Sequence, residues 1–181
     1  HTYLTGQLLL SHSLLTSEDV VIAKQHACRV ASLLGIKAKD QARIAIAVFE
    51  IAYNAYQHGK HGTVSYYINR HYAEACYIIK IADKGNGIAK LEQLLTGQSS
   101  QTGIFKVKKI LDSFVQMSIT TAPDMGSEFI FKCYLGKDFL LTTDFVRKII
   151  EELKLAKPPN LEAEIANQNK ELLNAFTSIS L

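Results

Sequence analysis

The most constraining feature of the sequence is the segment 43–58, which reads RIAIAVFEIAYNAYQH. Its apolar residues recur at the three- and four-residue spacing of an α-helix, and they form a surface wide enough to lie against a sheet. Glu50, Asn54 and His58 are four residues apart, so the same helix places them on one stripe beside that surface. Polar groups there need partners, because burying them unpaired is costly. A ligand, a metal ion or a hydrated groove could supply those partners; the alternative is the plain polar edge of a core helix.

Composition narrows the class of protein. The 181 residues suit one ordinary domain, and 48% hydrophobic with 20% charged residues argues against disorder. A net charge of +3 without a dense basic run argues against a nucleic-acid partner. No apolar run reaches the ~18 residues that cross a bilayer, and no signal peptide is visible, so no membrane association is expected. Three cysteines without C-x-x-C spacing favour reduced thiols in the cytoplasm.

The order of expected elements predicts an α+β fold. Ser17 is the expected N-cap of the first helix, with acidic residues in its first turn. Long helices beside strands joined in hairpins predict a two-layer sandwich, with a mixed, mainly antiparallel sheet covered by helices. Strands are expected at about 8–15, 63–69, 75–82, 116–121 and 128–135, and helices at about 17–34, 39–58, 91–95, 104–114 and 143–157.

A change of character near Gly136 predicts two regions, a domain at 1–136 and a helical extension at 137–181. Beyond a helix at 143–157, apolar residues alternate by fours and threes with one polar member, Gln168, as in a short coiled-coil seam. We expect this segment to link to a further domain and to support a homodimer. The first residue is His1 rather than Met, so we expect a piece of a longer protein. The seam consists of Leu161, Ile165, Gln168, Leu172, Ala175 and Ile179.

A second candidate site is the turn Asp83-Lys-Gly85-Asn-Gly87-Ile88, which follows an expected strand. Alternate glycines would let the backbone approach a flat ligand without clashes from Cβ atoms. The Asp83 carboxylate could accept a hydrogen bond from an exocyclic amine such as that of adenine. Taken alone, the turn is better explained as an ordinary glycine-rich connection.

Two further segments complete the pattern. Gly103 precedes an amphipathic helix, and free N–H groups at a helix start suit a phosphate. Lys106 lies within its first turn and could offer its ammonium group to the phosphates, although a solvated helix lysine is the simpler explanation. Gly126 and Ser127 precede the final strand, where a simple hairpin turn is the alternative.

Together, in this order, these segments resemble the Bergerat ATP-binding fold. This is the superfamily of gyrase-type topoisomerases, ninety-kilodalton heat-shock chaperones, histidine kinases and mismatch-repair ATPases. Within it, the stretches Ala31-x-x-Leu34-Gly35 and Asp40-Gln-Ala-Arg-Ile44 are similar to the small anti-sigma-factor serine kinases of bacterial stress switches. The resemblance covers about residues 8–135. Its motifs are Glu50-x-x-x-Asn54-Ala-x-x-His58, Asp83-x-Gly85-x-Gly87-Ile88, the helix from Gly103, and Gly126-Ser127-Glu128-Phe129.

The resemblance implies roles for individual residues. Asn54 would hold Mg²⁺ against the phosphates, and Glu50 would act as a general base toward the phosphoryl acceptor. Asp83 would bind the adenine amine of ATP, with Gly85 and Gly87 beside it. The resemblance also implies nucleotide contacts at Ile88, Gly103, Ser127 and His58. Lys106 is a further candidate contact, through its ammonium group.

The implied function is an ATP- and Mg²⁺-dependent kinase that phosphorylates a Ser or Thr on a partner regulatory protein. The expected partner is an anti-sigma-antagonist-like domain or a sigma factor. One departure concerns segment 99–106, which corresponds to the lid that wraps the phosphates in the family. It keeps only Gly103 of the several glycines usual there, so we expect slow phosphoryl transfer. Two alternatives remain open: a non-catalytic nucleotide sensor that signals through its C-terminal helix, and the ATP-binding half of a histidine kinase.

Overall fold

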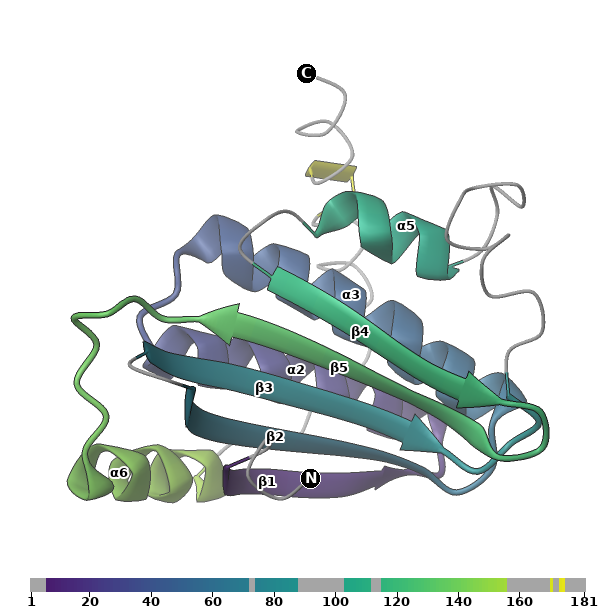
Figure 1. The fold of residues 1–181 in the computed structure, drawn as a ribbon, viewed down its shortest axis with the longest axis horizontal. Helices are drawn as coiled ribbons and strands as arrows, with labels where there is room; N and C mark the ends of the chain where they lie inside the picture. Colours follow the sequence, from purple (N-terminus) through teal and green to yellow (C-terminus); the bar gives the residue numbers. More distant parts are fainter. Residues whose placement is uncertain are drawn as a thin grey trace.

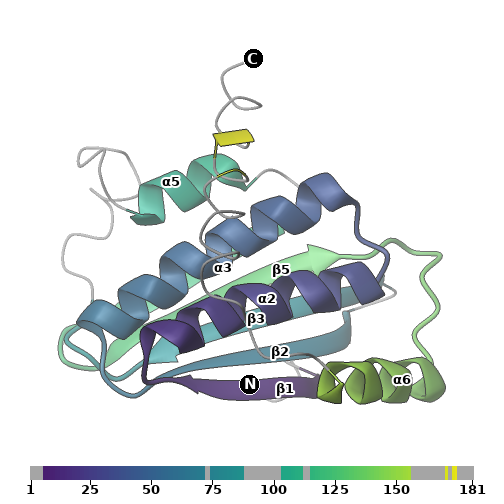
Figure 2. The same cartoon turned by 180° about the vertical axis from the view of Figure 1, so that it is seen from behind.

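The computed structural model describes residues 6–71, 74–87, 103–111, 115–155, 170 and 173–174. It is an α+β structure in which a five-stranded sheet carries helices on one face (Figures 1 and 2). The two-layer arrangement expected from the sequence is therefore confirmed. The strands are β1 (Gln7–Leu14), β2 (Gly62–His71), β3 (Glu74–Asp83), β4 (Val115–Ala122) and β5 (Gly126–Tyr134). The helices are α2 (Ser17–Leu33), α3 (Ala38–His58), α5 (Gly103–Ile110) and α6 (Thr143–Lys154).

The strand order is β1-β2-β3-β5-β4, and all four pairings are antiparallel. The expectation of a mixed sheet was therefore wrong for the described strands. The physical reason is the position of β5. Strands β3 and β4 run parallel to each other across the α5 crossover, but β5 folds back from β4 and inserts between them. No parallel neighbours are left in the sheet.

Two long helices cover one face of this sheet because each carries a continuous apolar surface. The buried residues of α3 include Ile44, Val48 and Ile51, which belong to the main core together with residues of β2 and β3. Two buried tyrosines add directional contacts between the layers. Tyr66 of β2 donates to the Ala23 carbonyl at 2.9 Å, and Tyr77 of β3 donates to the Ala27 carbonyl at 3.1 Å. These bonds satisfy the phenol groups and fix α2 across the sheet.

The N-cap of the first helix lies one residue before the expected one. Thr16, rather than Ser17, is the N-cap of α2, and its hydroxyl accepts a hydrogen bond from the Asp19 backbone N–H at 3.3 Å. The Asp19 carboxylate accepts in return from the Thr16 backbone N–H at 3.0 Å. This capping box requires a carboxylate three residues after the cap, a spacing that Thr16 and Asp19 satisfy.

Helix α6 packs against α2 and β1 at the edge of the sheet (Figure 1). Ile149 and Leu153 are buried in the main core, and Arg29 of α2 forms a 3.0 Å ion pair with Glu152. The expected helix at 91–95 lies outside the described residues, as do all six residues of the expected coiled-coil seam. No helix in the described part of the chain is long and apolar enough for a bilayer.

Candidate functional site

The Asp83 turn packs directly against the C-terminal end of α3. A Cβ atom added at Gly59, the residue that ends this helix, would stand 2.6 Å from the Asp83 Cβ atom. A Cβ added at Gly85 would stand 2.9 Å from the Gly59 Cα atom and 3.1 Å from the His58 carbonyl oxygen. The structure thus brings Asp83 to the end of the helix that carries Glu50, Asn54 and His58.

The Asp83 carboxylate is held in place locally and remains half-buried. Its Oδ1 atom accepts a hydrogen bond from the Gly85 backbone N–H at 2.8 Å. The Lys84 backbone N–H donates to the Lys60 carbonyl at 2.6 Å, which joins the turn to the connection after α3. A carboxylate fixed by its own turn keeps its other lone pairs available to a ligand.

The glycines of this turn have a role that the sequence did not suggest. They were expected to let the backbone approach a flat ligand, but the close approaches in the structure are to the chain itself. Gly85 lies against Gly59, and Gly87 has a φ of +79° with its absent Cβ 2.3 Å from the Ala122 carbonyl oxygen. Gly126 has a φ of +80°, and its absent Cβ is 2.0 Å from the Asp83 carbonyl oxygen. These glycines allow α3, the turn and the β4–β5 hairpin to converge.

The polar stripe of α3 lies beside α5. Ile46, one helical turn before Glu50, packs against Ile110 near the end of α5, and both side chains are fully buried. Figure 1 shows α5 running antiparallel to α3, so the N-terminal end of α5 lies toward the C-terminal half of α3. Glu50 and Asn54 are half-buried on this stripe. Neither side chain has a hydrogen bond or ion pair within the described part of the chain.

The remaining predicted site residues lie on α5, at the end of α3 or outside the described residues. Gly103 begins α5 and Lys106 is half-buried in its first turn, at the end of α5 nearer the polar stripe. His58 is exposed, and it contributes its backbone carbonyl to the junction with Gly85. Ile88 and residues 99–102 lie outside the described residues.

Ser127 lies next to Asp83, because the two residues are direct partners in the β3–β5 pair. It is buried, and its Oγ atom lies 3.1 Å from the Oγ1 atom of Thr121, its partner across the β4–β5 hairpin. Thr121 was missed by sequence reasoning. A signal existed, because Val115, Met117 and Ile119 set the inward register of β4 and Thr121 continues it as a polar residue opposite Ser127.

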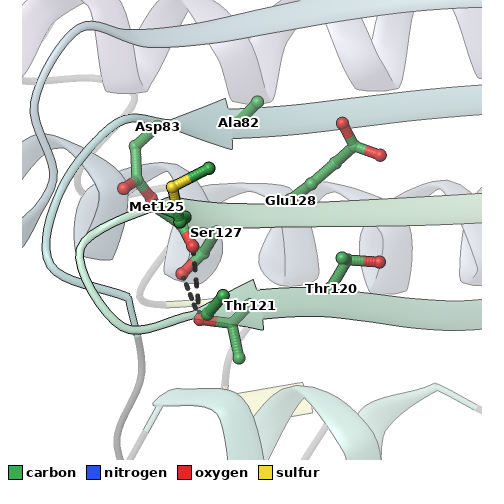
Figure 3. A pocket seen from close by; sticks show the side chains of 9 residues that line it. Ala82, Asp83, Thr120, Thr121, Met125, Ser127 and Glu128 are labelled. Carbon is green, nitrogen blue, oxygen red and sulfur yellow. Dashed lines mark hydrogen bonds between the residues drawn. The ribbon is translucent and has the colours of Figure 1, made fainter.

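A pocket of about 370 Å³ opens at this end of the sheet (Figure 3). Strand alternation places Asp83, Ser127 and Thr121 on the helix-covered face, and Ala82 and Glu128 on the other face. The pocket therefore reaches the open face of the sheet, and no residue of α3 lines it. Glu50 and Asn54 of the polar stripe do not line it. The lining residues are Ala82, Asp83, Thr120, Thr121, Ala122, Met125, Gly126, Ser127 and Glu128.

The donor set suits a magnesium ion only when phosphates complete it. Within the described ranges, no three His, Cys, Asp or Glu side chains gather into a metal site. Mg²⁺ prefers oxygen ligands, keeps several waters and is commonly held by one or two protein groups together with phosphates. The Asn54 carboxamide, half-buried beside Glu50, fits that requirement.

Comparison with known proteins finds similarity to a distant relative. No family model matches the chain. The sequence is 29% identical over 120 residues to the serine/threonine-protein kinase RsbT of Bacillus subtilis (strain 168). The matched region covers 64% of this chain and 88% of RsbT. The chain is thus similar, at a distance and over most of the length of that protein, to a bacterial protein kinase.

Proposed function

We propose that this protein binds ATP with Mg²⁺ in a Bergerat-type site and transfers the γ-phosphoryl group to a Ser or Thr of a partner protein. The observation that carries the proposal is the junction of Gly59 with Gly85, which places the Asp83 carboxylate at the end of the helix bearing Glu50 and Asn54. The similarity to the kinase RsbT supports the same chemistry. The partner class is a small anti-sigma-antagonist-like domain, and the reaction takes place in the cytoplasm.

Each group has a distinct task. The Asp83 carboxylate accepts a hydrogen bond from the adenine amine, and it would meet a carbonyl in guanine. Asn54 holds the metal ion, and the N-terminal end of α5 at Gly103 offers N–H groups to the phosphates. Bound Mg²⁺ would neutralise charge that develops on the phosphate oxygens.

Glu50 is the group that handles the proton. The acceptor hydroxyl gives its proton to the Glu50 carboxylate while its oxygen forms the new bond to the γ-phosphorus. The bond from that phosphorus to the bridging oxygen breaks, and ADP leaves. A base in this role contributes ~10²–10⁴-fold in rate. Glu50 is suited to it because the carboxylate makes no hydrogen bond or ion pair to other described residues.

Calorimetric titration with ATP and with GTP, each with and without Mg²⁺, tests the binding part of the proposal. We expect ATP to bind, Mg²⁺ to tighten binding, and GTP to bind more weakly. Equal affinity for ATP and GTP would contradict the adenine site. Asn54→Ala should remove the effect of Mg²⁺ while adenosine binding stays nearly unchanged, whereas a purely structural role of Asn54 predicts lower stability with the metal effect intact.

Transfer is tested with labelled ATP and candidate antagonist domains. The Glu50→Gln variant should bind ATP with the parent's affinity and lose ~10²-fold or more of the transfer rate. Thr102 and Lys106 occupy sequence positions at which glycines would let more N–H groups converge on the phosphates, so we expect slow transfer in the parent.

The second candidate is a nucleotide sensor without transfer, and the single glycine in segment 99–106 favours it. In that function, nucleotide occupancy would be passed to the C-terminal helices. Figure 1 shows α6 at the opposite end of the sheet from the Asp83 turn, so a signal would have to cross the whole domain. Absence of transfer in the parent, with unchanged ATP binding in Glu50→Gln, would select the sensor.

A further inference from the structure

The hydroxyl groups of Thr121 and Ser127 form a short relay beside Asp83. The Thr121 hydroxyl donates to the Gly126 carbonyl oxygen at 3.3 Å, and its oxygen lies 3.1 Å from the Ser127 Oγ atom (Figure 3). A carbonyl oxygen can only accept, so the first contact uses the single proton of Thr121. The second contact must then be made with the proton of Ser127.

Because the Ser127 proton is used in the bond to Thr121, Ser127 can act toward a ligand only as a hydrogen-bond acceptor. Once its O–H group donates to Thr121, the Ser127 oxygen presents lone pairs alone. Ser127 and Asp83 are direct partners on adjacent strands, so their Cβ atoms lie about 4.5–5.5 Å apart on the same face. No hydrogen bond joins these two side chains within the described residues, as the relay requires.

We infer that Thr121 is a positioning residue that holds Ser127 as a hydrogen-bond acceptor beside Asp83, so that the two acceptors together select an amino group over a carbonyl on the purine. An exocyclic amine has two N–H groups and can serve both acceptors, whereas a carbonyl meets two acceptors and finds no donor. The inference rests on the proposed nucleotide site and adds the residue that sets its base selectivity. Thr121 acts through Ser127 rather than by contact with the ligand.

The test measures selectivity against a base that carries a carbonyl in place of the 6-amine and, with it, a proton on the adjacent N1. Calorimetry with ADP and with IDP compares an amine with a carbonyl at the same purine position. Thr121→Val keeps the shape of the side chain but removes the hydroxyl, so the Ser127 proton is released and can donate to a carbonyl. We expect the ADP-to-IDP affinity ratio to fall about tenfold or more, the scale of one hydrogen bond to a charged or buried group. Thr121→Ser restores the hydroxyl and should keep the ratio within about twofold of the parent.

Two controls separate positioning from structural damage. In the Ser127→Ala background, Thr121→Val should cause no further loss of selectivity, because its effect passes through the Ser127 hydroxyl. Thr63→Val makes the same substitution at an exposed position of β2, a strand that pairs with neither β5 nor β4, and it should leave the ratio unchanged. If Thr121→Val does not fold, as judged by its thermal melt, Thr121→Ala repeats the comparison with a smaller side chain.

The outcomes distinguish a failure of the proposed nucleotide binding from a failure of the role assigned to Thr121. If the parent binds neither nucleotide, the proposed function fails and the role of Thr121 fails with it. If the parent prefers ADP and Thr121→Val keeps that preference, only the role of Thr121 is overturned. An additive loss in the double variant also overturns it, because Thr121 would then act without Ser127.

Discussion

At the scale of single residues, a pair of histidines makes stability depend on pH. His12 of β1 and His26 of α2 have ring centroids 5.6 Å apart, beside the buried Tyr66. Burial, with a smaller contribution from the charge of His12, lowers the pKa of His26 from 6.5 to about 4. The unfolded chain therefore binds this proton more readily than the folded chain. The stabilisation is complete above pH 6.5 and is lost as the pH falls from 6.5 toward 4.

Urea unfolding at pH 7, 6 and 5 measures this dependence. We expect the midpoint to fall with the pH in the parent and to fall less steeply in His26→Gln, which cannot take up the proton. The exposed His58 provides a matched control, and His58→Gln should keep the slope of the parent. Equal slopes in all three proteins would show that other groups cause the acid sensitivity.

Asp83 carries the most direct prediction about the ligand. Asp83→Asn should weaken ATP binding by ~1–3 kcal/mol, because a hydrogen bond to a buried charged acceptor is replaced by one to a neutral carboxamide. Calorimetry measures the loss. Asp124→Asn makes the same change at an exposed hairpin position whose φ of +59° Asn tolerates well, so it should bind ATP as the parent does.

At the scale of elements, the contact between α3 and the β3 turn requires glycine at position 59. In Gly59→Ala the new Cβ would overlap the Ala55 carbonyl oxygen and the Asp83 side chain, both 2.6 Å away. We expect a loss of ~1–3 kcal/mol in stability, as for other overpacked sites, together with weaker ATP binding because Asp83 is displaced.

Gly35→Ala is the comparison for that variant. Gly35 has a φ of +76° and nothing within 4 Å of its absent Cβ, so alanine there meets backbone strain alone. It should cost ~1–2 kcal/mol in stability and leave ATP affinity unchanged. Denaturant unfolding and calorimetry on both variants separate the two effects. Normal ATP affinity in Gly59→Ala would show that the helix end does not position Asp83.

Local patterns were sufficient to predict the elements but not their pairing. The apolar spacing and the glycines at 35, 59 and 136 predicted the helices and strands to within a few residues. The place of β5 between β3 and β4 has no local signal, because it depends on how one hairpin docks against another. For the same reason, sequence reasoning found Asp83 and Ser127 as separate motif residues. It could not find Thr121, whose part depends on a neighbour across the hairpin.

At the scale of the whole molecule, α6 and the proposed nucleotide site lie at opposite ends of the sheet (Figure 1). Ile149 of α6 is buried in the main core, far from the Asp83 turn (Figure 1). Ile149→Ala should lower the free energy of unfolding by ~2–5 kcal/mol, the usual cost of removing a buried isoleucine side chain. ATP affinity at a temperature where the variant is folded should not change.

The neighbouring Lys148 gives the control for that measurement. Its side chain is exposed, so Lys148→Ala should alter stability by no more than ~0.5 kcal/mol. Urea unfolding of both variants provides the comparison. A reduced ATP affinity in folded Ile149→Ala would indicate coupling between the two ends, which the sensor function requires.

The strand order also determines when the Asp83–Ser127 site forms during folding. Strands β2 and β3 form one local hairpin, and β4 and β5 form another. Asp83 and Ser127 face each other where β3 pairs with β5, which joins the two hairpins. Local hairpins form early, whereas joining them closes a long loop and is slower. Neither hairpin alone contains both acceptors, so in the proposed function the nucleotide would bind only to chains in which the two hairpins have paired. Bound nucleotide should therefore slow unfolding and leave the rate of folding nearly unchanged.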